Sequence, residues 1–349
     1  MIKMKGIILH GGHGTRLRPL THTGPKQLLP IANKPMSEYC LNSIKETGIT
    51  EIAIIIGGLG SKKVIDYYGS GEKFGVKITY IEQDEPRGIA HAVGLCKDFV
   101  GKDKFLVFLG DNIIQKPISE YRKNFEDTES DATLLLCEVE NPSRFGIADV
   151  LNGNIKKITE KPKDPTSNLA VTGIYFLTPK IFDVIKNLEP SWRNELEITD
   201  ALQKLLENNC KISYEIITDY WKDTGTPEDI INANSQILAD LNERKIGEGT
   251  LIEKGAKVHE NSIIGKNCKI SDGVIIGPNT SIGDNVIIEN VDKSSSIDIE
   301  NSIIMSDCLI QGSITIRQSI ISSKCSIKRN ENEPEDKILL LGEGTQISV

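Results

Sequence analysis

IEKGAKVHENSIIGKNCKISDGVIIGPNTSIGDNVII, residues 252–288, carries an aliphatic side chain at every sixth position. These positions are Ile252, Val258, Ile264, Ile270, Ile276, Ile282 and Ile288. Glycine and asparagine recur between them, as tight turns require. Ordinary strands alternate with a period of two, and a generic β-sandwich is the alternative interpretation. A sustained period of six is typical of a coil in which each repeat supplies one face and one turn. The stretch therefore predicts a left-handed parallel β-helix.

The period is interrupted once and then resumes. Asn290–Asn301 breaks the register, and we expect it to form a protruding loop. The period returns at Ile304, Ile310 and Ile316, then slips by one residue to Ile321 and Ile327. After an acidic segment at 330–336, the apolar Lys337–Leu341 is expected to cover the open end of the coil, because unpaired strand edges need covering.

The first 240 or so residues have a different pattern. Short apolar runs predict strands at Gly6–Leu9, Ile52–Ile56, Lys77–Glu82 and Phe105–Leu109. Helical patterns lie between them at Met36–Thr47, Lys62–Tyr68 and Ile89–Phe99, the first followed by Gly48 as a C-cap. This alternation predicts an α/β, Rossmann-like sheet, whose ligands bind beyond the carboxyl ends of the strands. We therefore expect three parts, at 1–243, 247–329 and 330–349.

Composition bounds the function. With 349 residues and a net charge of −8, the chain is long enough for two domains and lacks the basic balance of a general nucleic-acid binder. No apolar stretch approaches the length of a membrane span. The seven cysteines are scattered without a CxxC pair, which fits reduced thiols in a cytoplasmic protein.

The first predicted strand leads into a glycine-rich, basic segment. Gly11-Gly12-His13-Gly14-Thr15-Arg16-Leu17-Arg18-Pro19 is followed by Pro25-Lys26-Gln27-Leu28-Leu29-Pro30. Glycines let backbone N–H groups approach an anion, and Arg16 with Lys26 can clamp phosphates. The segment matches neither a Walker A loop nor GxGxxG, and a glycine-rich turn alone is as often purely structural. The two cations favour phosphate binding.

Further motifs make the chain resemble one family. The segments GGHGTRLRPLT and PKQLLPIANKPM are similar to the signature of the sugar-nucleotide pyrophosphorylases. The motifs that follow keep that family's order: Glu82-Gln83, Pro86–Ala90, Leu109–Asn112, Phe145-Gly146, Glu160–Pro162, Val171–Tyr175, Arg193–Asp200 and Trp221–Thr226. The resemblance covers about Met1–Leu241. The residues of these motifs resemble those of glucose-1-phosphate thymidylyltransferases, in the longer form that carries a hexapeptide-repeat domain.

The resemblance implies a role for each motif residue. It implies that a nucleotide triphosphate, dTTP or UTP, contacts Gly11, Gly12, Gly14, Thr15, Arg16, Gln27, Gln83, Gly88 and Asp111. It implies that a sugar 1-phosphate contacts Gly146, Glu160, Lys161, Val171, Thr172 and Gly173. Arg16, Lys26, Asp111 and Lys161 would be catalytic, and Asp111 with Asp223 would hold Mg²⁺. Without the resemblance, each aspartate would more often be a turn or cap residue, and Glu160-Lys161-Pro162 a charged strand end.

Alternatives remain open at this point. A uridylyltransferase shares most of these motifs, because discrimination between pyrimidines lies in pocket contacts. The repeat domain also resembles acyltransferases that use a histidine base, for which His259 is the one histidine present. A non-catalytic sensor would not need both metal carboxylates. We expect the coil to serve as an assembly surface of a homo-oligomer, since stacked repeats present flat faces.

Overall fold

The computed structural model describes residues 3–12, 14–58, 60–240, 245–290, 296–328 and 340–348. The chain divides into two compact units. One comprises Met1–His13 and Ser37–Asp223, and the other comprises Gly14–Met36 and Thr224–Val349.

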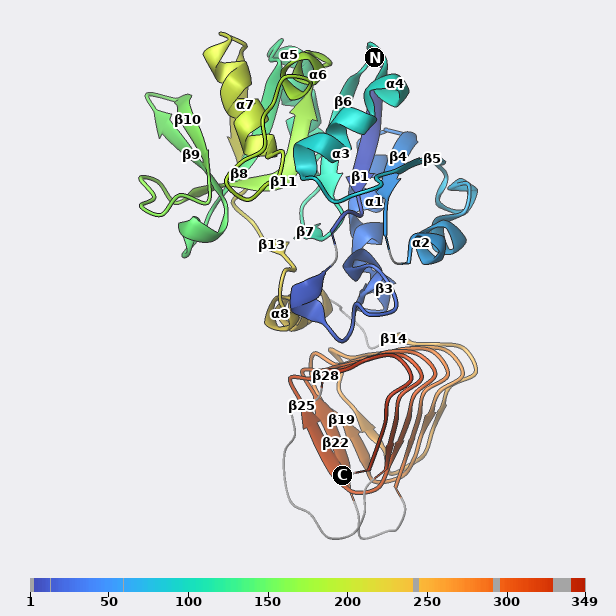
Figure 1. The fold of residues 1–349 in the computed structure, drawn as a ribbon. Coiled ribbons are helices and arrows are strands. Elements are labelled where there is room, and N and C mark those ends of the chain that lie inside the picture. The colour runs from blue at the N-terminus through green and yellow to red at the C-terminus, as the bar shows by residue number, and fades with distance from the viewer. Residues whose placement is uncertain are drawn as a thin grey trace. The chain divides into compact units, whose positions relative to one another are not determined.

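The first unit is built on a mixed β-sheet with helices on both faces (Figure 1). Four parallel strands lie side by side in the order β6 (Lys104–Leu109), β1 (Met4–Leu9), β4 (Glu51–Ile56) and β5 (Lys77–Glu82). Their bounds confirm the four predicted strands to within two residues. Burial on both faces explains their continuous aliphatic sequence.

The other half of this sheet is mostly antiparallel. β11 (Leu169–Leu177) runs antiparallel to β6, and β8 (Ala132–Glu138) and β12 (Ile212–Ile216) extend the sheet beyond it. β9 (Gly146–Leu151) and β10 (Asn154–Glu160) form a hairpin that joins β11 where Ile147 faces Ala170. A separate short ladder pairs β7 (Asn112–Ile114) with β13 (Trp221–Asp223).

Helices cover the sheet. They are α1 (Met36–Glu46), α2 (Ser61–Tyr68), α3 (Ile89–Leu95), α4 (Lys97–Val100), α5 (Ser119–Asp127), α6 (Lys180–Ile185) and α7 (Ile198–Glu207), with short 3-10 helices η3 (Glu72–Phe74) and η4 (Pro142–Arg144). One core joins Ile7 and Val107 of the sheet to α3, α6 and α7. On the opposite face α1 packs closely, since a Cβ added at Gly6 would lie 2.9 Å from Ile44 Cγ2.

The structure confirms α1 and α2 and corrects the third helix. The single helix expected over Ile89–Phe99 is wrong, because the chain turns at Cys96, where ψ is 0°, and divides into α3 and α4. Gly48 ends the first helix as expected: its φ is 86°, and its N–H donates to Lys45 O. No helix in the described ranges combines the length and apolar character that crossing a bilayer requires.

The second unit contains a left-handed parallel β-helix (Figure 1). Its rungs stack into three parallel sheets, in the orders β14-β17-β20-β23-β26-β28, β15-β18-β21-β24-β27-β29 and β16-β19-β22-β25. The strands are β14 (Lys245–Ile246), β15 (Leu251–Ile252), β16 (Lys257–Val258), β17 (Ile263–Ile264), β18 (Lys269–Ile270), β19 (Val274–Ile276), β20 (Ser281–Ile282), β21 (Ile287–Glu289), β22 (Ile297–Glu300), β23 (Ile303–Ile304), β24 (Leu309–Gln311), β25 (Ile314–Arg317), β26 (Ile320–Ile321), β27 (Ser326–Lys328), β28 (Leu340–Leu341) and β29 (Gln346–Ser348). The predicted isoleucines fill its interior, and Ile264, Ile270 and Ile282 are at most 1% exposed.

Two expectations for the coil need correction. Part of the loop expected at Asn290–Asn301 is strand β22, which pairs with β19 and β25, so inward side chains resume at Ile297 and Ile299 instead of Ile304. Residues 291–295 lie outside the described structure. Leu340 and Leu341, expected to cap the coil, instead pair with β26 as a further rung. The rest of the expected cap, 337–339, and the predicted loop at 330–336 lie outside the described residues.

The second unit also contains segments from elsewhere in the chain. They are the 3-10 helices η1 (Thr15–Leu17) and η2 (Lys26–Leu28), the hairpin of β2 (Pro30–Ile31) and β3 (Lys34–Pro35), and helix α8 (Pro227–Ala239). Thr226 caps α8 by accepting from the Asp229 N–H, while the Asp229 carboxylate accepts from the Thr226 N–H.

Candidate active site at the carboxyl edge of the sheet

The parallel strands of the first unit end together. Leu9 of β1 lies opposite Leu109 of β6, and the Gly110 N–H donates to Leu9 O at 3.0 Å. The chain continues from β1 into Gly11 and Gly12, and from β6 into Asp111. The glycine-rich loop and the first predicted carboxylate therefore begin at neighbouring strand ends, where α/β sheets bind ligands.

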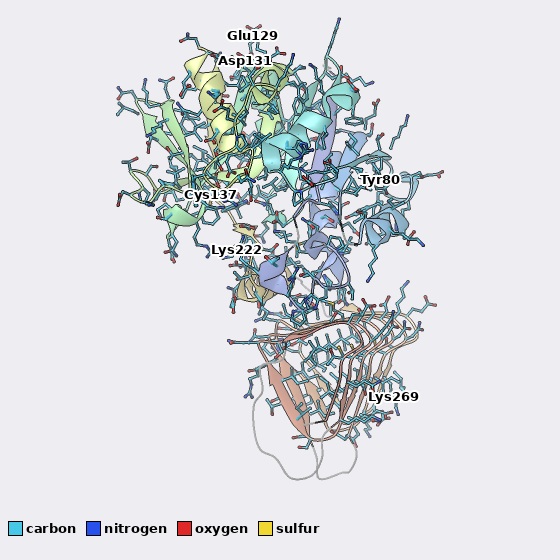
Figure 2. All side chains as sticks on the ribbon, in the orientation of Figure 1. Tyr80, Glu129, Asp131, Cys137, Lys222 and Lys269 are labelled. Carbon is cyan, nitrogen blue, oxygen red and sulfur yellow. The ribbon has the colours of Figure 1, made fainter. Side chains whose placement is uncertain are left out.

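The β7–β13 ladder brings the second predicted carboxylate to this edge. Asp223 pairs with Asn112, the residue that follows Asp111. Asn112 Nδ2 donates to Asp111 Oδ1 at 3.1 Å, and Asn112 Oδ1 accepts from Trp221 Nε1 at 2.8 Å. Lys222, labelled in Figure 2, lies between Trp221 and Asp223 on β13. Asn112 thus ties the strand that carries Asp223 to the loop that carries Asp111.

A buried phenol lies among the carboxylates of the site. Burial raises the pKa of Tyr175, and the charges of Glu160, Asp111 and Asp223 raise this pKa further. The charges of the two predicted metal carboxylates and of the predicted sugar carboxylate therefore all raise the pKa of the same side chain, Tyr175. No cluster of three or more His, Cys, Asp or Glu side chains with metal-ligating geometry is found in the described residues. A cation here would take two protein carboxylates, which suits Mg²⁺ completed by phosphates and water.

Gln83 follows β5, the outermost of the four parallel strands, and so also lies at their carboxyl ends. It is 5% exposed, its N–H donates to Ile56 O at 2.7 Å, and its Nε2 lies 2.9 Å from His91 Nδ1. A Cβ added at Gly11 would lie 3.2 Å from Gln83 Oε1. The fold therefore brings the glycine-rich loop and the predicted base-binding amide together.

Gly88 has a steric reason to be glycine. Its φ is 104°, and an added Cβ would lie 2.5 Å from Leu196 O. Two backbone bonds surround this approach: Leu196 N donates to Arg87 O at 2.8 Å, and Ala90 N donates to Leu196 O at 3.0 Å. Gly88 therefore joins the predicted base-binding loop to the Arg193–Asp200 motif.

The predicted sugar residues gather around the β9–β10 hairpin. Glu160 lies opposite Gly146, and its Oε2 accepts from Thr199 Oγ1 at 3.0 Å. Lys161 Nζ lies 3.4 Å from Glu160 Oε1, and the Lys161 N–H donates to Phe145 O at 3.0 Å. A Cβ added at Gly146 would lie 2.4 Å from Thr199 Cγ2. Gly146 is thus required for Thr199 to reach Glu160.

Arg193 is the functional candidate that sequence reasoning missed. Its Nη1 donates to Glu160 at 3.3 Å and to Glu197 at 3.2 Å, and its Nη2 donates to Glu195 at 3.2 Å. Burial raises the pKa of Glu197, and Glu160 adds to this, while Ser191 and Arg193 oppose it. The Arg193–Asp200 motif carries the signal, since its arginine is followed by Glu195 and Glu197.

β11 supplies the remaining predicted sugar residues. Its register with β8 shifts between Val171 and Tyr175. Thr172 is fully buried and donates its hydroxyl to Leu135 O at 2.8 Å, so this side chain fixes the irregularity. A Cβ added at Gly173 would lie 2.6 Å from Leu109 Cγ and 2.8 Å from Asn112 Nδ2. Gly173 therefore permits β11 to approach the Asp111 loop.

The remaining phosphate-loop residues belong to the second unit. Thr21 Oγ1 donates to Gly14 O at 2.8 Å, and Gly14 has a φ of 56°. Thr15 and Arg16 lie on η1 and are exposed, whereas η2 carries the half-buried Lys26 and the buried Gln27. A Cβ added at Gly14 would lie 3.4 Å from Lys26 Cβ, so the loop folds back on itself and brings its two cationic turns into one segment.

Two aspartates at the carboxyl edge of an α/β sheet, beside a glycine-rich loop, suit a protein that binds a nucleotide and a divalent cation. The nucleotidyl transferase family model matches residues 5–240, and the GMPPB C-terminal domain model matches residues 258–348. The chain belongs to the nucleotidyl transferase family.

Similar proteins narrow the comparison. The low-salt glycan biosynthesis nucleotidyltransferase Agl11 of Haloferax volcanii is 51% identical over 245 residues, which is 70% of this chain and 69% of that protein. A glucose-1-phosphate thymidylyltransferase of Streptomyces antibioticus is 45% identical, over 72% of this chain and 70% of its own length. A Bacillus anthracis crystal structure assigned to the glucose-1-phosphate thymidylyltransferases is 44% identical with a TM-score of 0.65, covering 68% of this chain and 96% of that one.

Proposed function

We propose that this protein is a glucose-1-phosphate thymidylyltransferase, which converts dTTP and glucose 1-phosphate into dTDP-glucose and pyrophosphate. The observation that carries the proposal is the β7–β13 pairing, which sets Asp223 beside the Asp111 loop. The charge of Glu160, the predicted sugar carboxylate, raises the pKa of the buried Tyr175, as do the charges of both aspartates. The sequence similarity to thymidylyltransferases supports the choice of substrates.

The reaction is an in-line displacement at the α-phosphorus. A phosphate oxygen of glucose 1-phosphate forms the new P–O bond while the bond between the α-phosphorus and the bridging oxygen to the β-phosphate breaks, so pyrophosphate leaves with that electron pair. Positioning and charge neutralisation dominate such a reaction. We assign Arg16 and Lys26 to the triphosphate, and Lys161 to the sugar phosphate.

Asp111 and Asp223 fit a magnesium ion, because both are carboxylates at one edge and the ladder ties their backbones together. When bound, Mg²⁺ supplies positive charge to the phosphates. Arg193 and Thr199 orient Glu160, whose oxygens would accept hydrogen bonds from sugar hydroxyls. Gly146, Val171, Thr172 and Gly173 complete the sugar side of the proposed site.

Gln83 would read a pyrimidine base, since its amide can both donate and accept. Gly88 has no side chain, so the backbone at this position would be able to approach the base closely. A single methyl group is worth only about 1–3 kcal/mol in a pocket, so we expect UTP to be used less well than dTTP and not to be excluded.

The test is a pyrophosphate-release assay with dTTP, UTP, ATP and GTP against several sugar 1-phosphates. We expect both pyrimidine triphosphates to be used with glucose 1-phosphate, dTTP with the higher kcat/KM. A preference for a purine triphosphate would overturn the base assignment. A clear preference for UTP would retain the reaction class and make the protein a uridylyltransferase.

We also propose a homo-oligomer assembled through the coil, a cytoplasmic location, and the division into 1–243, 247–329 and 330–349. All seven cysteines are free thiols, which supports the location.

Acyl transfer by the coil would need His259 as its base. This histidine is exposed, and its Nδ1 accepts from the Asn261 N–H at 3.1 Å. We assign this histidine to the turn.

A further inference from the structure

Asn234 of α8 forms a buried polar junction in the second unit. The residue is 0% exposed. Its Oδ1 accepts from the Ala32 N–H at 2.9 Å and from Ser281 Oγ at 2.7 Å, and its Nδ2 donates to Asn279 O at 3.0 Å. One amide therefore joins α8, the β2–β3 hairpin and the coil. A fully satisfied buried amide specifies one arrangement, because displacing it leaves several polar groups unpaired.

The turn of the β2–β3 hairpin makes a second tie to the coil. Ala32 and Asn33 have φ values of 47° and 62°, as a two-residue hairpin turn of type I′ requires. Asn33 Nδ2 donates to Ile282 O of β20 at 2.5 Å. Alanine adopts this backbone region at a cost, which the bond from its N–H to Asn234 helps to offset.

The sheet face at this junction is covered. Ile303 and Ile320 share a register column with Ser281, pointing outward where Ile304 and Ile321 point into the coil. Both are nonetheless at most 1% exposed. On another face of the coil, the outward column of Leu251, Lys269 and Ile287 is open: Leu251 is 57% exposed, and Lys269 projects from the surface in Figure 2. The bonds to Asn33 and Asn234 identify the hairpin and α8 as covering elements.

The segment that carries Arg16 and Lys26 approaches the coil at two places. The hairpin follows η2 after a single residue, Leu29, whose carbonyl accepts from the Met36 N–H at 3.1 Å. Between the two cations, a Cβ added at Gly342 of the last rung would lie 3.3 Å from Pro19 Cβ. Each cation is therefore followed by a point of close approach to the coil, Pro19 after Arg16 and the hairpin after Lys26.

We propose that the β-helix is a positioning element for the phosphate-binding segment, with Asn33 and Asn234 as its positioning residues. The coil supplies fixed acceptors and donors, at Ile282 O, Asn279 O and Ser281 Oγ, against which the hairpin is seated. Positioning then reaches Lys26 through Leu29, the single residue between η2 and the hairpin, and reaches Arg16 through the close approach of Gly14 to Lys26. This inference rests on the proposed function in that these two cations bind the triphosphate.

Asn33→Gly is the sharpest test, because glycine keeps the left-handed backbone and removes only the bond to Ile282. Asn285→Gly is the matched control: Asn285 has a φ of 57°, and its Nδ2 donates to Asp307 at 3.0 Å within the coil. Ser281→Ala, which removes one bond to Asn234, is the second test variant. Each full-length protein is measured by hydrogen–deuterium exchange of peptides from 14–36 and by separate KM values for dTTP and glucose 1-phosphate.

We expect Asn33→Gly and Ser281→Ala to speed exchange in the 14–36 peptides about threefold to tenfold and to raise the KM for dTTP by a similar factor. The KM for glucose 1-phosphate should stay within about twofold, and Asn285→Gly should change neither readout. Unchanged exchange in both test variants would overturn the inference, as would faster exchange with an unchanged KM for dTTP. Failure of the proposed function is a separate result, namely no nucleotidyl transfer by the wild-type protein. Hydrogen–deuterium exchange would still show in that case whether the bonds to the coil hold residues 14–36 in place.

Discussion

Asp223 lies opposite Asn112 in the antiparallel β7–β13 pair. Asn112 is the residue that follows Asp111 in the chain. These aspartates are more than a hundred residues apart in sequence, and only tertiary pairing makes them neighbours. Asn112 fixes the pairing from both sides, because its amide bonds to Asp111 and to Trp221. The proposed metal site therefore depends on a three-residue ladder.

Replacing either aspartate by asparagine should cut kcat about a hundredfold or more, which is the scale of losing a major electrostatic stabiliser. Chelation of Mg²⁺ should abolish wild-type turnover. Steady-state kinetics at saturating substrates measure both effects, with the exposed Asp98 of α4 replaced by asparagine (Asp98→Asn) as the control. Full activity of Asp111→Asn would rule out the two-carboxylate site.

Gly146→Ala should weaken the sugar phosphate site through one identifiable clash. The new Cβ would lie 2.4 Å from Thr199 Cγ2, so Thr199 must move away from Glu160. We expect the KM for glucose 1-phosphate to rise tenfold or more. Thr199→Ser removes the methyl and keeps the hydroxyl, so the double variant should recover most of the loss. A double variant as impaired as Gly146→Ala would contradict this assignment.

Much of this arrangement could be predicted from sequence, for physical reasons. The six-residue period of Ile264, Ile270 and Ile276 specifies the coil, because each face of the coil needs one inward aliphatic side chain and consecutive faces are six residues apart. The apolar runs of β1 and β6 specify buried strands, and position Asp111 at their edge. Local pattern therefore sufficed where a regular repeat or a continuous apolar run marks the buried residues.

The remainder depends on tertiary contacts. Ile297 and Ile299 of β22 follow an insertion that shifts the six-residue register, so the sequence did not reveal their strand. Arg193 is surrounded in sequence by glutamates, and its partner Glu160 is selected by the β9–β10 hairpin. Asn234 is a single amide in an ordinary helix, and nothing local indicates its junction.

Arg193→Met should raise the KM for glucose 1-phosphate about tenfold, because Glu160, Glu195 and Glu197 lose a shared cation. The KM for dTTP should change little. Arg193→Lys should recover part of the loss, since it restores the charge without the fork that spans several carboxylates. Lys3→Met, which breaks a more exposed pair with Glu51, is the control. Equal effects on both KM values would point to general misfolding instead.

His10 should make the first unit less stable as pH falls. Burial lowers its pKa from 6.5 to about 3, partly opposed by Asp111. Below pH 6.5 the unfolded chain binds a proton that folded His10 does not, so stability is complete above that pH and falls toward pH 3. Between pH 7 and pH 5 this amounts to about 2 kcal/mol.

Urea unfolding of the metal-free protein, followed by tryptophan fluorescence, measures this effect, because Trp192 and Trp221 both lie in the first unit. The free energy of unfolding should depend less on pH in His10→Leu, by about 2 kcal/mol over this interval. The same pH dependence in the variant and the wild type would show that His10 does not titrate as a buried group.

The most direct test of the central claim is phosphorus NMR of the wild-type protein with dTTP, glucose 1-phosphate and Mg²⁺. We predict that dTDP-glucose and pyrophosphate appear in equal amounts, and that neither forms when glucose 1-phosphate or Mg²⁺ is omitted. Pyrophosphate released without glucose 1-phosphate, or dTTP cleaved to dTDP and inorganic phosphate, would contradict sugar-1-phosphate nucleotidyl transfer.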